Sequence, residues 1–170
     1  MHTTRLIYLI SFLIICLLLG GGFYLEVTTG FTPCPLCILQ RTLFGLLGVL
    51  FFFGLLFANK KSIRFFINGF ILLSAGLGSL LAGRQIWLQH FASTGTHECG
   101  VSLQYMLHVL PLNEVMQKIF SGSAECRERG LTFLSFDLAE WALLWFIVFL
   151  IVGGWLFFRT SINRKPPRSP

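Results

Sequence analysis

Four long apolar segments constrain this chain more than any other feature. They cover residues 6–25, 38–58, 65–83 and 138–158, and each is close to the roughly 20 helical residues that cross a hydrocarbon core of about 30 Å. Only 12% of the residues are charged and 55% are hydrophobic, whereas about a quarter of a soluble domain is charged. The pattern argues against a disordered chain, a coiled coil or a free cytosolic enzyme. It predicts an all-α membrane protein, a four-transmembrane-helix bundle forming one integral membrane domain over residues 1–170.

The charged residues orient these spans. Loops rich in Lys and Arg stay on the cytoplasmic side, so the head with Arg5, the basic turn at 59–64 and the tail after residue 158 are expected inside. Both termini are then cytoplasmic, and two segments, about 26–37 and 84–137, face outward. The net charge of +6 divides into +8 inside and −2 outside, with all seven acids on the outer side. The basic residues lie between apolar runs, which argues against a nucleic-acid surface.

The first apolar run has a second interpretation. Three small residues, Gly20, Gly21 and Gly22, follow its start, as at the cleavage site of a secretory signal peptide. The run nevertheless continues to Leu25 at full spanning length, so we favour a retained span. The orientation of the other three spans is the same in both cases.

The second outer segment is too long to be a simple connection between packed helices. Within it, apolar residues follow helical spacing from Leu112 to Phe120, after Pro111 and before the Ser121-Gly122 stretch. This predicts a short amphipathic helix. It either lies in the membrane interface with its apolar face down or packs on the outer end of the bundle.

Four of the five cysteines fall outside the membrane core. They form two pairs, Cys34 with Cys37 and Cys99 with Cys126, while Cys16 lies mid-span and is expected to behave as a small hydrophobe. In an oxidising outer compartment such pairs favour disulfides over metal. A zinc site is further disfavoured because 26 residues separate the members of the second pair. A covalent haem site needs His directly after a CxxC motif, and that position holds isoleucine.

The spacing gives the two pairs different expected roles. Cys34-Pro35-Leu36-Cys37 is a CxxC with proline inside, which is typical of a dithiol that cycles. The Cys99 and Cys126 pair encloses a long loop, and as a purely structural bridge it would simply restrain that loop.

The residues that follow the CxxC favour a catalytic role. Cys37 falls in the first turn of the second span, where helix amides supply partial positive charge and favour a thiolate. Gln40 and Arg41 come three and four residues later and share its helix face. Arg41 at the membrane boundary costs free energy unless it reaches water or has an anionic partner, for which a thiolate or a ligand oxygen would serve. The alternative is a plain interfacial anchor.

A dithiol at the bilayer surface can pass two electrons to an outer protein or to a lipid-dissolved quinone. A quinone headgroup needs hydrogen-bond donors facing an apolar pocket, and Arg41 and Gln40 are candidates. A polar cluster at the outer end of the third span offers more donors, with His90 a candidate proton donor. Its members are Arg84, Gln85, Gln89 and His90. The cluster is equally consistent with a polar helix end that leaves the membrane.

Several motifs together resemble one family. They are Pro33-Cys34-Pro35-Leu36-Cys37 before Gln40-Arg41, Leu110-Pro111-Leu112 ahead of Ser121-Gly122, and Glu125-Cys126 running into Phe133-Leu134 and Trp141. Over nearly its whole length the chain resembles the disulfide bond formation protein B family, bacterial inner-membrane enzymes that reoxidise the periplasmic oxidase DsbA with quinone.

The resemblance implies an electron relay. A DsbA thiolate would attack Cys99 in a Cys99–Cys126 disulfide, and the freed Cys126 would attack Cys34. Cys37 would then remain as a thiolate beside ubiquinone or menaquinone, stabilised by Arg41. The implied partners are a periplasmic DsbA-like thiol oxidase and the membrane quinone pool.

Parts of the resemblance are weak, and two other functions stay open. Residues 96–98 show little match to the family, so no partner-docking residue is assigned there. Glu98 beside Cys99 disfavours a thiolate, which suits a cysteine that is attacked as a disulfide. The first alternative is a membrane scaffold with purely structural disulfides. The second is a thiol oxidoreductase like the vitamin K epoxide reductases, although their CxxC commonly comes late in the chain.

Overall fold

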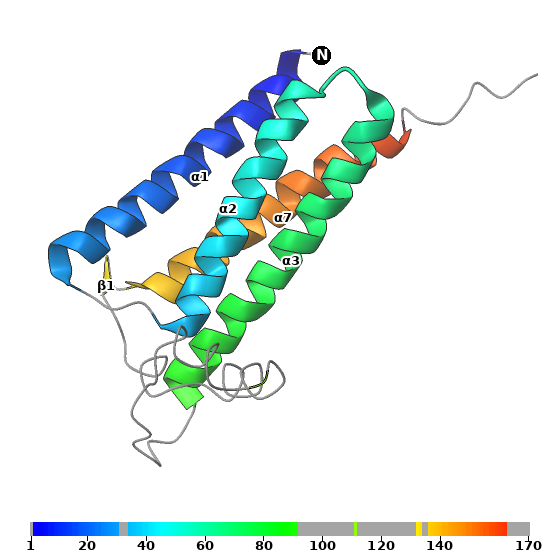
Figure 1. The fold of residues 1–170 in the computed structure, drawn as a ribbon. Helices are drawn as coiled ribbons and strands as arrows, with labels where there is room; N and C mark the ends of the chain where they lie inside the picture. Colours follow the sequence, from blue (N-terminus) through cyan, green and yellow to red (C-terminus); the bar gives the residue numbers. More distant parts are fainter. Residues whose placement is uncertain (1, 31–33, 92–110, 112–131, 134–135, 163–170) are drawn as a thin grey trace, which may run out of the picture.

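The computed structural model describes residues 2–30, 34–91, 111, 132–133 and 136–162. Four helices lie side by side, α1 (His2–Thr29), α2 (Pro35–Leu56), α3 (Lys61–Phe91) and α7 (Leu138–Ile162) (Figure 1). A two-residue antiparallel pair, β1 (Thr132–Phe133) and β2 (Phe136–Asp137), precedes α7. Each of the four helices is long and apolar enough to cross a membrane. The predicted all-α fold with four spans is therefore confirmed.

Two helices extend beyond the predicted spans. The apolar pattern predicts a third span ending at residue 83, with an outer segment from 84, and the helix of that span, α3, continues to Phe91. Residues 84–91 contain no Gly or Pro that would end the helix, and Gln85 and Leu88 are buried, so the helix continues past its apolar stretch. The first span likewise reaches Thr29 rather than Leu25. The short helix expected over 112–120 lies outside the described residues.

Local signals fix the helix ends nearest the site. α1 ends where Gly30 takes a positive φ of 65°, and its N–H donates to the Glu26 carbonyl at 3.0 Å, which is the left-handed cap that glycine favours. α7 begins with the Glu140 carboxylate accepting the Asp137 N–H at 3.0 Å, half of a capping box. Both caps lie at the end of the bundle that carries the cysteines.

Aromatic rings fill the contact between α2 and α7. Phe44 stacks on Phe146 with ring centroids 4.0 Å apart, and Phe51 lies 5.7 Å from Phe149. At Gly78 on α3, any Cβ would overlap the Phe146 ring, so glycine is required for this close approach. The central rings therefore tie three helices together.

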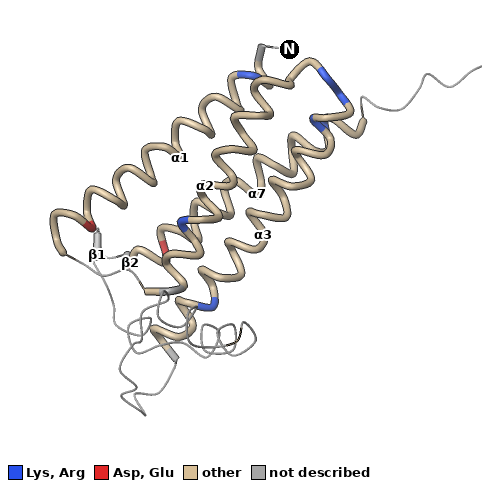
Figure 2. The backbone as a smooth tube through the Cα atoms, in the orientation of Figure 1, with Lys and Arg blue, Asp and Glu red and all other residues tan. Residues whose placement is uncertain are grey.

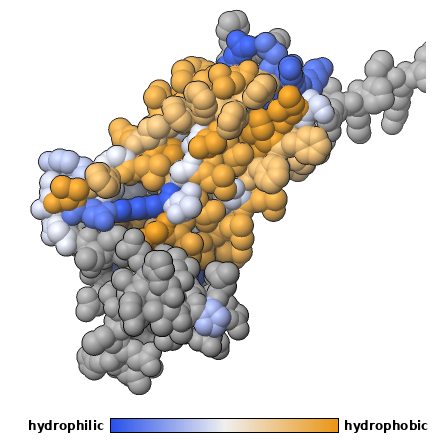
Figure 3. Space-filling view, viewed as in Figure 1, coloured by the Kyte–Doolittle hydropathy of each residue, from blue (hydrophilic) through white to orange (hydrophobic). Residues whose placement is uncertain are grey.

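The outer surface of the helices is an apolar belt (Figure 3). Leu17 is 75% exposed and Leu80 is 71% exposed, a pattern that is stable only when lipid replaces water. Five of the seven described Lys and Arg residues gather at the end that holds the N-terminus (Figure 2), which we call the basic end, and the other two are Arg41 and Arg84. The basic end comprises Arg5, Lys60, Lys61, Arg64 and Arg159. The described acids lie toward the opposite end, which carries Cys34 and Cys37 and which we call the cysteine end.

Candidate active site

The start of α2 places the CxxC sulfurs. Cys34 is the N-cap residue, with extended backbone (φ −67°, ψ 160°), and Pro35 occupies the first turn, where proline costs no hydrogen bond. The Cys34 sulfur accepts the Cys37 backbone N–H at 3.4 Å and lies 2.9 Å from the Cys37 sulfur. Cys34 is only 2% exposed and Cys37 is half-buried. The predicted position of Cys37 in the first turn is confirmed, and both sulfurs lie where helix amides favour negative charge.

A buried amide from α3 contacts the sulfurs, and a second buried amide, from α2, contacts the first. Nε2 of Gln85 lies 3.2 Å from the Cys37 sulfur and 3.7 Å from the Cys34 sulfur. Oε1 of Gln85 accepts from Nε2 of Gln40 at 2.8 Å. Gln40 is 5% exposed and Gln85 is 3% exposed. The predicted candidate Gln40 is thus brought to the site, but its Nε2 is engaged by Gln85.

Arg41 is held by α1. Its Nη1 donates to the Glu26 carboxylate, and its Nη2 donates to the Gly22 carbonyl at 3.3 Å. The sequence suggested a thiolate or a ligand oxygen as its anionic partner, and it missed this carboxylate. The available signal was position, because Glu26 is the only acid among the first 97 residues and lies at the end of the first span.

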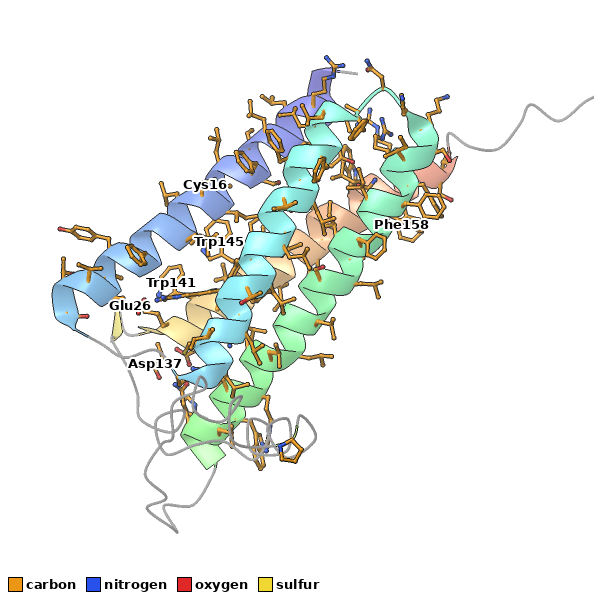
Figure 4. The ribbon with its side chains drawn as sticks, viewed as in Figure 1. Cys16, Glu26, Asp137, Trp141, Trp145 and Phe158 are labelled. Carbon is orange, nitrogen blue, oxygen red and sulfur yellow. The ribbon has the colours of Figure 1, made fainter. Side chains whose placement is uncertain are left out.

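A cavity of about 360 Å³ opens between α1, α2 and α7. Its polar wall is the α2 face that carries Cys37, Gln40 and Arg41. In Figure 4, Trp141 and Trp145 project from the side of α7 that faces α1. The remaining apolar wall includes Leu17, Leu18, Leu25, Phe44, Leu138 and Ala142. Cys34 does not line the cavity, so Cys37 is the sulfur that meets it.

The rest of the polar cluster on α3 does not reach the cavity. The ring of His90 is exposed, with Nδ1 3.1 Å from the Ile86 carbonyl of its own helix. The Arg84 guanidinium stacks over Trp87, 4.7 Å from the ring centroid. Of the four residues in the cluster, only Gln85 is brought to the sulfurs, and none lines the cavity.

The three remaining cysteines lie away from the cavity lining or outside the described residues. Cys99 and Cys126 lie outside the described residues, so their pairing stays a prediction. Cys16 lies on an exposed face of α1, where it meets lipid rather than another helix.

The structure combines a CxxC pair at a helix N-terminus with four helices long enough to span a membrane, and one of the two sulfurs lies on the wall of an apolar cavity. These features are those of a membrane thiol oxidoreductase. The family model described as Disulfide bond formation protein DsbB matches residues 4–156. The chain belongs to this family.

Individual relatives match this chain over nearly their full length. Disulfide bond formation protein B of Hahella chejuensis is 38% identical over 158 residues, covering 92% of this chain and 95% of that protein. The protein of the same name from Azoarcus sp. is 37% identical over 160 residues, covering 94% and 95%. Disulfide bond formation protein B 1 of Pseudomonas aeruginosa is 34% identical over 146 residues, covering 86% and 90%. The predicted family resemblance is confirmed.

Proposed function

We propose that this protein reoxidises a periplasmic DsbA-like dithiol oxidase and passes the electrons to a quinone in the bacterial inner membrane. One observation carries the proposal. The Cys37 sulfur stands on the wall of an apolar cavity beside Gln40 and Arg41, whereas Cys34 is buried outside that wall. The pair therefore has one sulfur directed toward a lipid-soluble acceptor, and we assign exchange with another cysteine to the other.

The residues of the cavity fit a quinone. Its volume of about 360 Å³ lies within the range of pockets that take small molecules. Phe44, Trp141 and Trp145 offer flat apolar faces for a ring, and Arg41 has guanidinium N–H groups beyond those given to Glu26 and Gly22. Arg41 would hold one carbonyl oxygen, and the second N–H of the Gln40 Nε2 group, beyond the one given to Gln85, would donate to the other. A bound quinone supplies an acceptor for two electrons and two protons.

The cysteine chemistry follows from thiol–disulfide exchange. A partner thiolate attacks Cys99, the Cys99–Cys126 bond breaks, and the electron pair leaves on Cys126. The Cys126 thiolate then attacks Cys34, a new Cys126–Cys34 bond forms, and the Cys34–Cys37 bond breaks. The electron pair leaves on Cys37, at the cavity wall. The partial positive charge at the start of α2 favours this leaving thiolate.

The proposed topology places the cysteine end in the periplasm and both termini in the cytoplasm. The described Lys and Arg residues gathered at the basic end support it, because cytoplasmic segments carry such residues in excess.

The direct test uses purified full-length protein in detergent with a reduced DsbA-like partner and ubiquinone. We expect quinone absorbance to fall as the partner becomes oxidised, two electrons for each disulfide formed. A parallel reaction with menaquinone tells which quinone is preferred. If a folded protein and a competent partner give no quinone reduction, the proposal is overturned, and cysteines that stay oxidised throughout would identify a structural scaffold.

A further inference from the structure

The amide of Gln85 is placed against the reacting sulfurs rather than against the cavity. Its Nε2 lies 3.2 Å from the Cys37 sulfur, while Gln85 is 3% exposed and is not on the cavity lining. It comes from α3, whereas Arg41 lies on α2 and bonds residues of α1. A buried donor in this position acts on charge at sulfur and not on a bound headgroup.

The orientation of that amide is fixed by Gln40. Nε2 of Gln40 donates to Oε1 of Gln85 at 2.8 Å. If the Gln85 amide turned over, two N–H donors would face each other and a carbonyl oxygen would face the sulfurs. Both arrangements are unfavourable in a buried site, where each donor needs an acceptor. Gln40 therefore keeps the N–H side of Gln85 directed at the cysteines.

The Gln85 amide lies closer to one of the two cysteine sulfurs than to the other. Gln85 Nε2 is nearer to Cys37, at 3.2 Å, than to Cys34, at 3.7 Å. When a thiolate attacks Cys34 of the Cys34–Cys37 disulfide, the new S–S bond forms at Cys34 and the electron pair leaves on Cys37. Hydrogen bonds to an anion are stronger than those to a neutral group. The donor therefore favours the sulfur that becomes negative.

We propose that Gln85 is a catalytic residue that stabilises the Cys37 thiolate by donating a hydrogen bond, and that Gln40 is the positioning residue that orients it. The assignment rests on the proposed function for the direction of electron flow. The hydrogen bond itself is testable without partner or quinone, so the two proposals fail separately.

The experiment measures thiolate population directly. The full-length chain carries Cys16→Ser, Cys34→Ser, Cys99→Ser and Cys126→Ser, which leaves Cys37 as its sole cysteine. Alkylation by iodoacetamide is followed by mass spectrometry near pH 7 and again at about pH 10, where thiols are largely ionised. Gln85→Met keeps length and volume but removes the donor. Asn68→Leu is the matched control, because Asn68 is also a fully buried amide of α3 but bonds Tyr8 and Thr160 instead of a cysteine.

We expect Gln85→Met to slow alkylation near pH 7 by roughly ten- to a hundredfold and to leave the rate at about pH 10 nearly unchanged. Gln40→Met should slow it by a smaller factor, since the donor is present but no longer oriented. If Gln85→Met fails to fold, the double variant Gln40→Met with Gln85→Met removes both partners and leaves no unpaired amide. It should show the same loss.

Three results would overturn the assignment. One is an unchanged rate near pH 7 in a folded variant without Gln85. The other is an equal loss at both pH values, which would mean altered access to Cys37 rather than altered charge. A loss of similar size in Asn68→Leu would also overturn it, because the effect would then follow general loosening of α3.

Discussion

The two ends of the bundle both bury amide groups, but they use them differently. At the basic end, the Tyr8 hydroxyl donates to Oδ1 of Asn68 at 2.7 Å, and Nδ2 of Asn68 donates to the Thr160 hydroxyl at 3.3 Å. That hydroxyl in turn donates to the Leu156 carbonyl at 2.8 Å, so the chain of bonds ends within a helix. At the cysteine end, the chain from Gln40 through Gln85 ends on sulfur.

The difference shows what decides the role of a buried polar group in an apolar bundle. A network that ends on backbone only satisfies its own members, and its removal costs stability. A network that ends on a reactive atom changes the charge that this atom can carry. We therefore expect substitutions at the cysteine end to change chemistry more than stability, and substitutions at the basic end to do the reverse.

The largest expected effect is the loss of Cys37. Cys37→Ser should abolish quinone reduction, because a serine hydroxyl does not exchange with disulfides, while the variant folds normally. Cys16→Ser is the matched control, since Cys16 lies on the exposed face of α1. It should retain wild-type turnover in the assay with reduced partner and ubiquinone. Equal turnover in both variants would show that the CxxC pair takes no part in quinone reduction.

The next effect is at Arg41. Arg41→Met should raise the KM for ubiquinone about tenfold or more, because a hydrogen bond from a charged group is worth about 1.5–3 kcal/mol. The stability of the bundle should change by only about 0–1 kcal/mol, since the ion pair with Glu26 is partly exposed, at 31% and 26% of the two side chains. Steady-state kinetics and thermal unfolding in detergent measure the two quantities. An unchanged KM would exclude Arg41 from the quinone site.

The opposite outcome is expected at the basic end. Asn68→Leu should lower the free energy of unfolding by about 1–3 kcal/mol, because the buried Tyr8 hydroxyl loses its acceptor. Turnover should stay at the wild-type level. Adding Tyr8→Phe should recover part of the stability, since both polar partners are then removed. If Asn68→Leu reduces turnover as strongly as stability, the two ends are coupled and the comparison fails.

The fold was largely predictable from the sequence because lipid imposes a length on apolar segments. Hydropathy located all four helices, yet the predicted third span stopped before Arg84, whereas α3 continues to Phe91 as a helix in which Gln85 and Leu88 are buried. Span ends depend on packing as well as on transfer into lipid, and packing is not encoded in a window of neighbouring residues.

The site was predictable where its residues share one helix. Cys37, Gln40 and Arg41 follow the spacing of a single α2 face, and all three line the cavity. Glu26 and Gln85 come from α1 and α3, so their contacts depend on how helices pack. Gln85 and His90 looked equivalent in the sequence, but α3 turns only Gln85 toward the sulfurs.

The smallest expected effect tests how the cysteine end holds Arg41. Glu26→Gln keeps the shape and an acceptor oxygen but removes the charge, so Arg41 is held less firmly at the cavity wall. We expect the KM for ubiquinone to rise by up to about fivefold, in line with the roughly 0.2–1 kcal/mol of a partly exposed ion pair. Glu140→Gln is the matched control, because glutamine also serves at its capping position. If both variants keep the wild-type KM, Arg41 is positioned by the Gly22 carbonyl and by packing, and the carboxylate only neutralises its charge.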